Sequence, residues 1–330
     1  MPIDKTSLQK VRDVIPCFKR PLQENQLGRI CVVGGCEEFV GGVYFAGISA
    51  KNLGSAKTYV LCSQYAAPAL RSYTSNLDVI PELDSSNPVD AFRKLAPNLD
   101  SVVFGPGLGI NKALHQNTKN LIIEAISLNK PIIVDADAVH IVINSAELIR
   151  GYRRCVLTPN NREFRRLYDA LIIQNENNQT QTRAKNQGQA GLFDTGYASK
   201  SQVEELAREL GGVTIISKGP QDIISNGSST IVCDAPNSNK RCWGQGDILS
   251  GSLATFLQWA VNLQEKTNPG DHEFDGILYA GFAACLLTRL CNVEAFKSHG
   301  RSMATSDMEQ CIKDVFNRYF KQSHCASDTL

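Results

Sequence analysis

The sequence lacks an excess of charge of either sign, and it lacks a long apolar run. Its 330 residues carry 34 basic and 33 acidic side chains, a formal net charge of +1. Proteins that bind nucleic acid or an acidic membrane surface usually carry a clear positive excess, so we expect neither partner. No uninterrupted run approaches the roughly 18 apolar residues of a membrane span, so we expect no such span. Hydrophobic residues still make up 42% of the chain, which excludes wholesale disorder.

The 11 cysteines form no C-x-x-C pair, and the five histidines are scattered without ligand spacing. This spacing indicates neither a zinc ribbon nor a redox dithiol. Residues 1–20 lack the apolar core of a secretory signal, and they carry Asp4 and Asp13, which is unlike an acid-poor transit peptide. We therefore expect reduced thiols and a cytoplasmic location, with a mitochondrial pool left open.

Several catalytic signatures are also missing. The sequence has no G-x-x-x-x-G-K-[ST] phosphate loop, no G-x-S-x-G nucleophile elbow and no H-E-x-x-H metal-binding helix. These absences disfavour a P-loop NTPase, a serine hydrolase of the elbow type and a zinc protease. Any catalytic chemistry must therefore come from other segments.

Short β-branched apolar runs alternate with longer helical patterns over most of the chain. Buried strands are predicted at 29–35, 57–63, 101–107, 131–137, 155–160 and 213–219. Their near-continuous apolarity suits a parallel sheet covered on both faces, and the intervals between them fit crossover helices. The pattern predicts an α/β fold whose ligands bind beyond the carboxyl ends of the strands.

After residue 219 the pattern changes. Residues 222–234 predict a hairpin that turns at Asn226-Gly227. The Gln- and Asn-rich stretch 174–191 predicts a mobile surface insertion, which is too short to link two large domains. Residues 1–330 are therefore interpreted as one domain, with its core over about 28–320. Three helices are expected near the end, at 247–265, 275–292 and 307–320.

The strongest local feature is the segment Trp243-Gly244-Gln245-Gly246-Asp247, which leads into an apolar helix. Two glycines before a helix let main-chain N–H groups approach an anion closely, and the helix dipole favours negative charge there. Asp247 is then either a plain N-cap or a base beside a bound phosphate. Gly251, one turn further on, costs up to ~1 kcal/mol of helix stability and therefore indicates close approach to another element.

A second motif begins with Thr158-Pro159 and continues through Asn160, Asn161, Arg162 and Glu163. Asn at an N-cap with Glu at the third helical position is a common helix start, so one interpretation is purely structural. The other interpretation is that Asn160 and Glu163 face the carboxyl edge of the sheet and hold a hydrated magnesium ion.

Three further strand ends carry candidate residues. Lys218 beside Gly219 either meets a phosphate or forms a surface turn. The segment Gly105-Pro106-Gly107-Leu108-Gly109 resembles a dinucleotide loop only loosely, because its glycine spacing is wrong and Pro106 fixes the turn. Asp135 and Asp137 either position a ligand or supply favourable acids at a helix N-terminus.

Taken together, these segments resemble the ribokinase-like family of NAD(P)H-hydrate dehydratases, which repair hydrated nicotinamide cofactors. The resemblance is carried by the segments 28–39, 103–109, 133–137, 157–164, 218–222, 242–253 and 295–308. The last two, CWGQGDILSGSL and AFKSHGRSMATSDM, are similar to the eukaryotic, ATP-dependent branch. The resemblance implies a three-layer α/β/α ribokinase-like fold with a mostly parallel central sheet. It implies ATP as co-substrate, Mg²⁺ as cofactor, and the S epimer of hydrated NADH or NADPH (NADHX or NADPHX) as substrate.

The resemblance also implies roles for individual residues. Asp247 is similar to the base that takes the proton of the hydrate's ring hydroxyl. The main-chain N–H groups of Gly244, Gln245 and Gly246 are similar to an anion hole for the transferring phosphoryl group. The residues implied to bind the hydrate are Gly107, Asn160, Asn161, Arg162, Glu163, Phe164, Arg165, Arg166 and Asp247. Those implied to bind ATP are Lys218, Gly219, Pro220, Gln221, Asp222, Asn237, Ser238, Asn239, Lys240, Arg241, Cys242, Trp243, Gly244, Gln245 and Gly246. Asn160 and Glu163 are implied to hold the magnesium ion through water.

This chemistry suits the residues, because phosphoryl transfer needs positioning and charge neutralisation more than a covalent nucleophile. The alternative is a ribokinase-like kinase of a small hydroxylated metabolite, which would leave a stable phosphorylated product. A nucleotide-binding protein without catalysis and a Rossmann dehydrogenase are weaker alternatives. The expected partners are small molecules, with a separate epimerase acting on the R epimer and the homo-oligomeric state left open.

Overall fold

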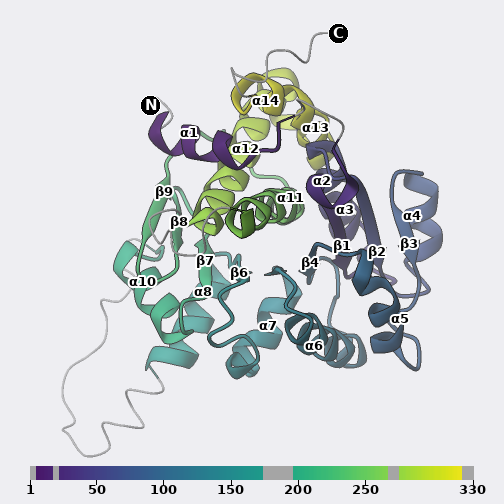
Figure 1. The fold of residues 1–330 in the computed structure, drawn as a ribbon. Helices are drawn as coiled ribbons and strands as arrows, with labels where there is room; N and C mark the ends of the chain where they lie inside the picture. Colours follow the sequence, from purple (N-terminus) through teal and green to yellow (C-terminus); the bar gives the residue numbers. More distant parts are fainter. Residues whose placement is uncertain (1–4, 18–21, 174–195, 267–274, 322–330) are drawn as a thin grey trace, which may run out of the picture.

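A nine-stranded sheet forms the centre of the computed structural model, which describes residues 5–17, 22–173, 196–266 and 275–321. The strand order is β3-β2-β1-β4-β5-β6-β7-β8-β9 (Figure 1). The strands are β1 (Arg29–Val33), β2 (Lys57–Leu61), β3 (Asp78–Ile80), β4 (Ser101–Phe104), β5 (Ile132–Val134), β6 (Cys155–Leu157), β7 (Thr214–Ser217), β8 (Asp222–Ser225) and β9 (Thr230–Cys233). The predicted insertion at 174–191 lies outside the described residues.

Strands β1 to β7 pair in parallel, whereas β8 is antiparallel to both β7 and β9. This arrangement confirms the prediction of a mostly parallel sheet that ends in a hairpin. The short edge strand β3 was not predicted. Its three residues are exposed or half-buried, so they lack the continuous apolar signal that marks the central strands. One continuous sheet is consistent with the interpretation of a single domain.

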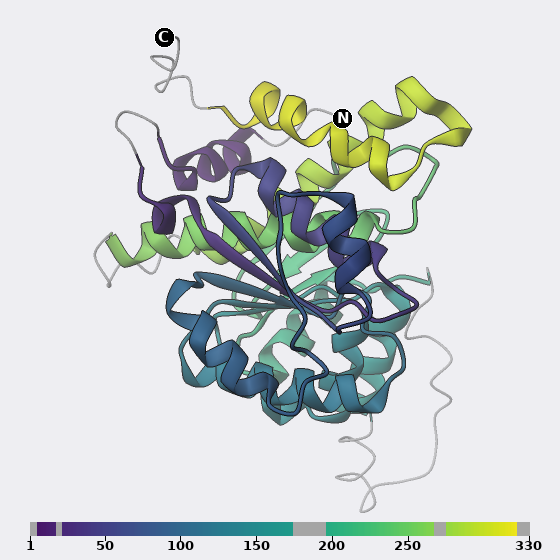
Figure 2. The same cartoon turned by 90° about the vertical axis from the view of Figure 1, so that its right-hand side faces the viewer.

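Two layers of helices cover the sheet, each over its own hydrophobic core (Figures 1 and 2). The layer at the top of Figure 1 contains α1 (Lys5–Val14), α3 (Gly41–Leu53), α4 (Ala67–Tyr73), α11 (Gln245–Lys266), α12 (Gly276–His299), α13 (Thr305–Gln310) and α14 (Ile312–Tyr319). The opposite layer contains α5 (Pro88–Leu95), α6 (Lys112–Ser127), α7 (Asp137–Asn144), α8 (Asn161–Tyr168) and α10 (Lys200–Glu209). Short helical segments are α2 (Glu24–Leu27), η1 (Ala96–Asn98), η2 (Ala146–Leu148), η3 (Asp169–Ile173) and η5 (Gly300–Ser302).

Helix ends differ from the sequence prediction in three places. Helix α12 continues to His299, seven residues beyond the expected end at 292. The helix expected at 307–320 is two helices, α13 and α14, that meet at Cys311. Helix α11 begins at Gln245, so Asp247 lies inside its first turn and is not the N-cap. A boundary shift of two residues is within the usual uncertainty of helix ends, but it changes what the Asp247 side chain is able to do.

Helix α12 is the one described helix that is long and apolar enough, by length and composition, to cross a membrane. Inside this fold 89% of its most apolar window is buried. It lies against α11 and packs over β8 and β9 in the upper layer, as a core helix of an α/β protein does.

The cysteines are mostly free thiols, as expected. Nine of them are free among the described residues. Cys17 is the exception, because it is disulfide-bonded. The expectation of reduced thiols was therefore wrong for Cys17. Sequence spacing alone does not reveal which cysteines form disulfides.

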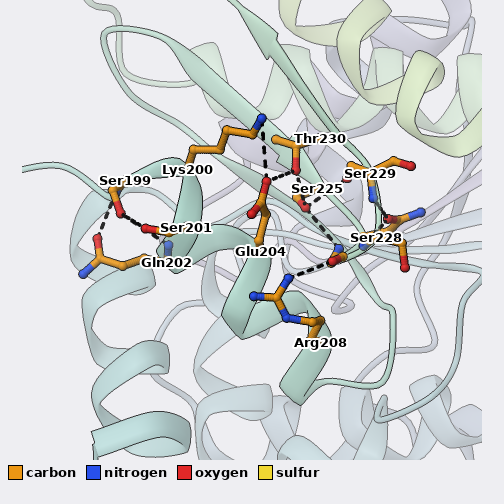
Figure 3. Close-up of polar contacts among 12 residues, drawn as sticks. Ser199, Lys200, Ser201, Gln202, Glu204, Arg208, Ser225, Ser228, Ser229 and Thr230 are labelled. Carbon is orange, nitrogen blue, oxygen red and sulfur yellow. Dashed lines mark hydrogen bonds and ion pairs between the residues drawn. The ribbon is translucent and has the colours of Figure 1, made fainter.

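Side-chain hydrogen bonds fix the β8–β9 hairpin to α10 (Figure 3). The hydroxyl of Thr230 donates to the carboxylate of Glu204 at 2.7 Å and lies 2.9 Å from the hydroxyl of Ser225. Arg208 donates to the main-chain oxygen of Gly227 at 2.9 Å. These bonds hold the hairpin that follows the loop at 218–222, and so they restrict where that loop lies.

Helix α11 crosses α3 at Gly251, where the two main chains touch. A Cβ atom built on Gly251 would lie 1.9 Å from the main-chain oxygen of Ala46. This contact confirms the prediction that a glycine here marks close approach to another element. The crossing brings the first turn of α11 to the carboxyl edge of the sheet.

We expect Gly251→Ala to destabilise the protein by about 3 kcal/mol, at the upper end of the usual cost of overpacking. The backbones of α3 and α11 would have to separate, and the gain in helix propensity of ~1 kcal/mol is too small to offset this. Denaturant unfolding measures the difference. Gly41→Ala is the matched control, because a Cβ atom there meets nothing within 4 Å. Equal stability of the two variants would contradict the tight crossing.

Candidate active site

Two cavities open at the carboxyl edge of the sheet, where the predicted site residues gather. The larger has a volume of about 640 Å³ and the smaller about 310 Å³. They share three lining residues, Asn160, Lys218 and Gly246. These three come from the ends of β6 and β7 and from the start of α11. A group that passes from one cavity to the other would cross at this wall.

The larger cavity is lined mainly by the loops after β1, β4 and β5 and by the start of α11. Its lining is Glu38, Phe39, Val40, Gly41, Gly42, Gly107, Gly109, Ile110, Asp135, Ala136, Asp137, Asn160, Glu163, Lys218, Trp243, Gly244, Gly246 and Asp247. Five of these side chains are carboxylic acids, and Lys218 is the only lysine or arginine among them. The cavity therefore combines a strongly acidic wall with a single fixed cation.

Asp247 lies deep in this site. A Cβ atom on Gly42 would be 3.3 Å from one carboxylate oxygen of Asp247 and 3.2 Å from the main-chain nitrogen of Gly107. Burial raises the pKa of Asp247 to about 7, with a further upward contribution from Asp135 and Asp137. Lys218 opposes this shift. A carboxyl group with a pKa near neutrality is suited to accept a proton from a substrate at physiological pH.

Lys218 is held by Asp135 at the junction of the two cavities. Its Nζ donates to Oδ1 of Asp135 at 2.9 Å, and the Thr158 hydroxyl donates to the same oxygen at 2.5 Å. Burial lowers the pKa of Lys218, but the neighbouring carboxylates of Asp135, Glu163 and Asp247 outweigh it and raise the pKa overall. The ammonium group therefore stays charged in the buried site.

The main chain around Asp135 is strained and tightly packed. Ala136 has a φ of 49°, which is rare for a residue with a side chain. A Cβ atom on Gly105 would lie 1.7 Å from the main-chain oxygen of Asp135. Only glycine fits there, and its φ of +125° also excludes other residues. Strain of this kind persists where the surrounding structure over-determines it, often at a functional site.

Asn160 and Glu163 form the helix start that the sequence allowed. The side-chain oxygen of Asn160 accepts from the N–H groups of Arg162 at 2.9 Å and Glu163 at 3.1 Å. Glu163 accepts in return from the N–H group of Asn160 at 2.8 Å. Both side chains nevertheless line the larger cavity, so capping and ligand binding do not exclude each other here. Burial raises the pKa of Glu163, and Lys218 partly offsets this.

The smaller cavity is built around a buried arginine that sequence analysis missed. Arg289 of α12 donates to Oδ2 of Asp222 at 2.6 Å and to the main-chain oxygens of Gly219 and Pro220 at 3.0 Å and 2.9 Å. These bonds hold the loop at 218–222 from behind. A lone arginine within an apolar helix was the signal that could have revealed it. An arginine is rarely buried unless polar groups pair with it, so its position indicates buried partners.

The structure distributes the residues implied to bind the hydrate over several environments. Gly107, Asn160, Glu163 and Asp247 line the larger cavity, and Asn161 lines the smaller one. Phe164 is buried in the core below the sheet. Arg165 donates to the main-chain oxygen of Gly196 at 2.9 Å, and neither it nor the exposed Arg162 and Arg166 lines either cavity.

Most of the residues implied to bind ATP meet at the smaller cavity. Its lining is Asn160, Asn161, Lys218, Gly219, Asp222, Asn237, Arg241, Cys242, Gln245, Gly246, Leu249, Cys285, Thr288 and Arg289. Trp243 and Gly244 line the larger cavity instead. Pro220, Gln221, Ser238, Asn239 and Lys240 line neither. Glu38, Phe39 and Ile110 also line the larger cavity, but they were not among the predicted site residues, because loop residues without a motif carry no local signal.

At the start of α11, two of the three main-chain N–H groups expected to bind an anion lack a main-chain acceptor in the described structure. The N–H group of Gln245 donates to the main-chain oxygen of Cys242 at 3.3 Å, and that of Asp247 donates to the main-chain oxygen of Gly244 at 3.0 Å. Among the described residues, the N–H groups of Gly244 and Gly246 have no such partner. Because the helix dipole is positive at this end, these two groups form the better anion site.

Comparison with known proteins identifies close relatives over almost the whole chain. A family model described as NAD(P)H-hydrate dehydratase matches residues 30–314. A protein of Pongo abelii named ATP-dependent (S)-NAD(P)H-hydrate dehydratase is 41% identical over 318 residues, covering 96% of this chain and 90% of its own length. The protein of the same name from Homo sapiens is also 41% identical, covering 96% of this chain and 85% of its own length.

Solved structures support the fold assignment. The structure of ADP/ATP-dependent NAD(P)H-hydrate dehydratase from Bacillus subtilis, co-crystallised with ATP and Mg²⁺, matches with a TM-score of 0.67. It covers 97% of this chain and 99% of its own, at 18% sequence identity. A ribokinase-like superfamily protein from Enterococcus faecalis matches with a TM-score of 0.71 at 18% identity, covering 94% of both chains. The three-layer ribokinase-like fold predicted from the sequence is therefore confirmed.

Proposed function

The chain belongs to the NAD(P)H-hydrate dehydratase family and catalyses ATP-dependent dehydration of the S epimers of NADHX and NADPHX, and we propose that its two cavities divide this reaction between them. The hydrate occupies the larger cavity and ATP the smaller one. The observation that carries this proposal is the shared wall of Asn160, Lys218 and Gly246, with the buried carboxyl of Asp247 next to it.

In the first step, Asp247 acts as the base. Its carboxylate takes the proton of the hydrate's ring hydroxyl while the hydroxyl oxygen attacks the γ-phosphorus of ATP. The bond between that phosphorus and the β–γ bridging oxygen breaks, and ADP leaves. The burial that raises the pKa of Asp247 to about 7 makes it a stronger base than an exposed carboxylate would be.

The transferring phosphoryl group crosses the shared wall. Lys218 supplies a fixed positive charge there, and the N–H groups of Gly244 and Gly246 supply donors for the phosphoryl oxygens. Because these groups are held in place before the reaction, they stabilise the developing charge without a further cost of reorganisation. Asp135 and Arg289 do not need to touch the phosphate; they position Lys218 and the loop at 218–222.

In the second step, the phosphorylated hydroxyl leaves as inorganic phosphate. The lone pair of the ring nitrogen expels the phosphate by breaking the carbon–oxygen bond, and the neighbouring ring carbon then loses a proton. The dihydropyridine double bond forms again. The overall reaction consumes the hydrate and ATP, and it yields NADH or NADPH, ADP, phosphate and a proton. No side-chain nucleophile is needed.

The acidic wall of the larger cavity fits a magnesium requirement. Five carboxylic acids and one lysine line this cavity, so a triphosphate brought to it needs further positive charge. No cluster of three or more His, Cys, Asp or Glu side chains with metal-binding geometry occurs in the described part of the chain. Bound Mg²⁺ would neutralise phosphate charge, with Asn160 and Glu163 holding it mainly through water.

We expect Glu163→Gln to raise the Mg²⁺ concentration needed for half-maximal activity about tenfold, in the range usual for outer-shell partners of a metal. Glutamine at this position preserves the capping interaction with Asn160, so the start of α8 should remain intact. Initial rates at fixed ATP over a series of Mg²⁺ concentrations give the value. The control is Glu147→Gln, which changes an exposed carboxylate that lines neither cavity. An unchanged Mg²⁺ dependence in Glu163→Gln would remove this residue from the metal site.

The function is tested by mixing the purified protein with NADHX, Mg²⁺ and ATP. The absorbance of reduced nicotinamide should return, and free phosphate should appear in equal amount. A stable phosphorylated product without recovery of absorbance would instead identify a small-molecule kinase. Replacing ATP by ADP tests the choice of phosphoryl donor.

We also propose a partner enzyme and a cellular location. A base fixed on one side of the reacting ring favours a single epimer, so a separate epimerase would supply the S form from the R form. The mostly free thiols support a cytoplasmic setting.

A further inference from the structure

Three exposed apolar side chains gather at the larger cavity. Phe39 is 46% exposed, Ile110 is 96% exposed and Trp243 is 90% exposed, and all three line this cavity. A Cβ atom on Gly109 would lie 3.3 Å from Cδ2 of Phe39, so this ring packs against the loop that carries Ile110. Single exposed apolar residues are ordinary, but several around one cavity indicate a contact with a ligand.

Trp243 combines an anchored main chain with an exposed indole. The Thr305 hydroxyl at the start of α13 donates to the main-chain oxygen of Trp243. The next residue, Gly244, also lies against Thr305, since a Cβ atom there would be 3.1 Å from Cγ2 of that side chain. The position of Trp243 is therefore fixed while its ring stays accessible. Such preorganisation lowers the entropic cost of binding a flat ligand.

We propose that Trp243 is the stacking platform for the adenine ring of the hydrated dinucleotide, an inference that rests on the function proposed above. The substrate has two rings, and the reacting one must reach Asp247 in the buried part of the cavity. The hydrated ring contains saturated carbons and is no longer a flat aromatic partner. Adenine is flat and aromatic, and an indole that is nine-tenths exposed offers the matching surface at the cavity's outer part.

The location of Trp243 separates this adenine from that of ATP. Trp243 lines the larger cavity and is absent from the lining of the smaller one, where the loop at 218–222 lies. Loss of the indole should therefore weaken binding of the hydrate without affecting ATP. Because the platform is remote from the reacting atoms, the effect should appear in KM and not in kcat.

Steady-state kinetics test this directly. We expect Trp243→Ala to raise the KM for NADHX about tenfold, an effect of the size usual for one stacked base. Its kcat and its KM for ATP should stay within about twofold of the wild type, and Trp243→Phe should recover most of the loss. The matched control is Tyr65→Ala, which removes an exposed aromatic ring that lines neither cavity.

A truncated substrate decides which ring stacks. The hydrate of reduced nicotinamide mononucleotide has the reacting ring but no adenosine. With this substrate, Trp243→Ala should match the wild type. An equal loss with both substrates, or no loss with NADHX, would overturn the proposal while leaving the dehydratase function in place. If the wild type itself fails to consume NADHX, the proposed function fails instead.

Indole fluorescence gives a second measurement that does not depend on turnover. The chain has two tryptophans, and Trp259 is buried, so Trp243 is the accessible fluorophore. With the smaller cavity saturated by a non-hydrolysable ATP analogue, ADP-ribose should quench the emission and nicotinamide mononucleotide should not. The quenching should be missing in Trp243→Phe. Quenching by the mononucleotide alone would assign the indole to the other ring and refute the proposal.

Discussion

The Asp247→Asn variant is expected to bind ATP normally and to lose at least about a thousandfold in kcat, within the range seen for removal of a general base. Asparagine keeps the shape of the side chain but accepts no proton from the substrate hydroxyl at neutral pH. Single-turnover phosphate release measures the chemical step, and equilibrium titration measures ATP binding. Asp169→Asn is the matched control, because it makes the same exchange at an exposed position. Near-wild-type turnover of Asp247→Asn would remove this residue from the role of base.

The same substitution should make the protein more stable at alkaline pH. The pKa of Asp247 is about 7 in the folded protein, against an ordinary value of 3.8. The stability associated with the neutral carboxyl is therefore fully present below pH 3.8 and is lost as the pH rises through 7. At pH 8 the wild type carries a buried charge that asparagine avoids. The Tm of Asp247→Asn should exceed that of the wild type at pH 8, and the difference should shrink as the pH falls toward 4.

A gain in stability together with loss of turnover is the pattern expected of a strained active site. It also separates the role of Asp247 from a structural one. A carboxylate that served mainly as a helix cap would stabilise the fold, and its replacement would lower the Tm. Because Asp247 lies within the first turn of α11 and is not its N-cap, we expect the opposite sign.

The sequence predicted those parts of the fold whose signal is local. The central strands are continuous apolar runs because helices cover both faces of the sheet, and each run contains the observed strand. Strand β3 escaped prediction because an edge strand needs no such run. The contact between Gly251 and Ala46 was predictable as a close approach, but its partner was not, since the two residues are distant in the chain.

For the site too, features with a local signal were predicted and contacts between distant residues were not. Asp247 was predicted because it follows two closely spaced glycines at the start of an apolar helix, a local pattern typical of an anion site. The pairing of Lys218 with Asp135 spans 83 residues, and that of Arg289 with Asp222 spans 67. Residues this far apart in the chain form no local pattern, so the sequence alone does not show that they pair. Phe164 shows the reverse problem, because its place within a functional motif concealed the helical period that directs it, with Leu167 and Tyr168, into the core.

Replacement of Lys218 by methionine is expected to lower kcat by about 100- to 1000-fold, the range seen when one preorganised group that stabilises transition-state charge is removed. The variant also leaves the buried Asp135 without its cation, which should destabilise the fold by about 3 kcal/mol or more. Stability alone could then reduce activity. The double variant Lys218→Met with Asp135→Asn removes both charges and should recover most of the lost Tm. Its kcat should remain low, and recovery of activity along with stability would show that Lys218 acts only on the fold.

The pH dependence of these variants tests the electrostatic link to the base. Wild-type kcat/KM for the hydrate should fall about tenfold for each pH unit below about 7, because Asp247 must be ionised in the free enzyme. Lys218 lowers the pKa of Asp247 and Asp135 raises it. The acidic limb of the profile should therefore move to higher pH in Lys218→Met and to lower pH in Asp135→Asn. Shifts in opposite directions follow if the titrating base is a carboxylate whose pKa both charges influence, as Asp247 is. Limbs that move together, or stay fixed, would place the titrating base elsewhere in the site.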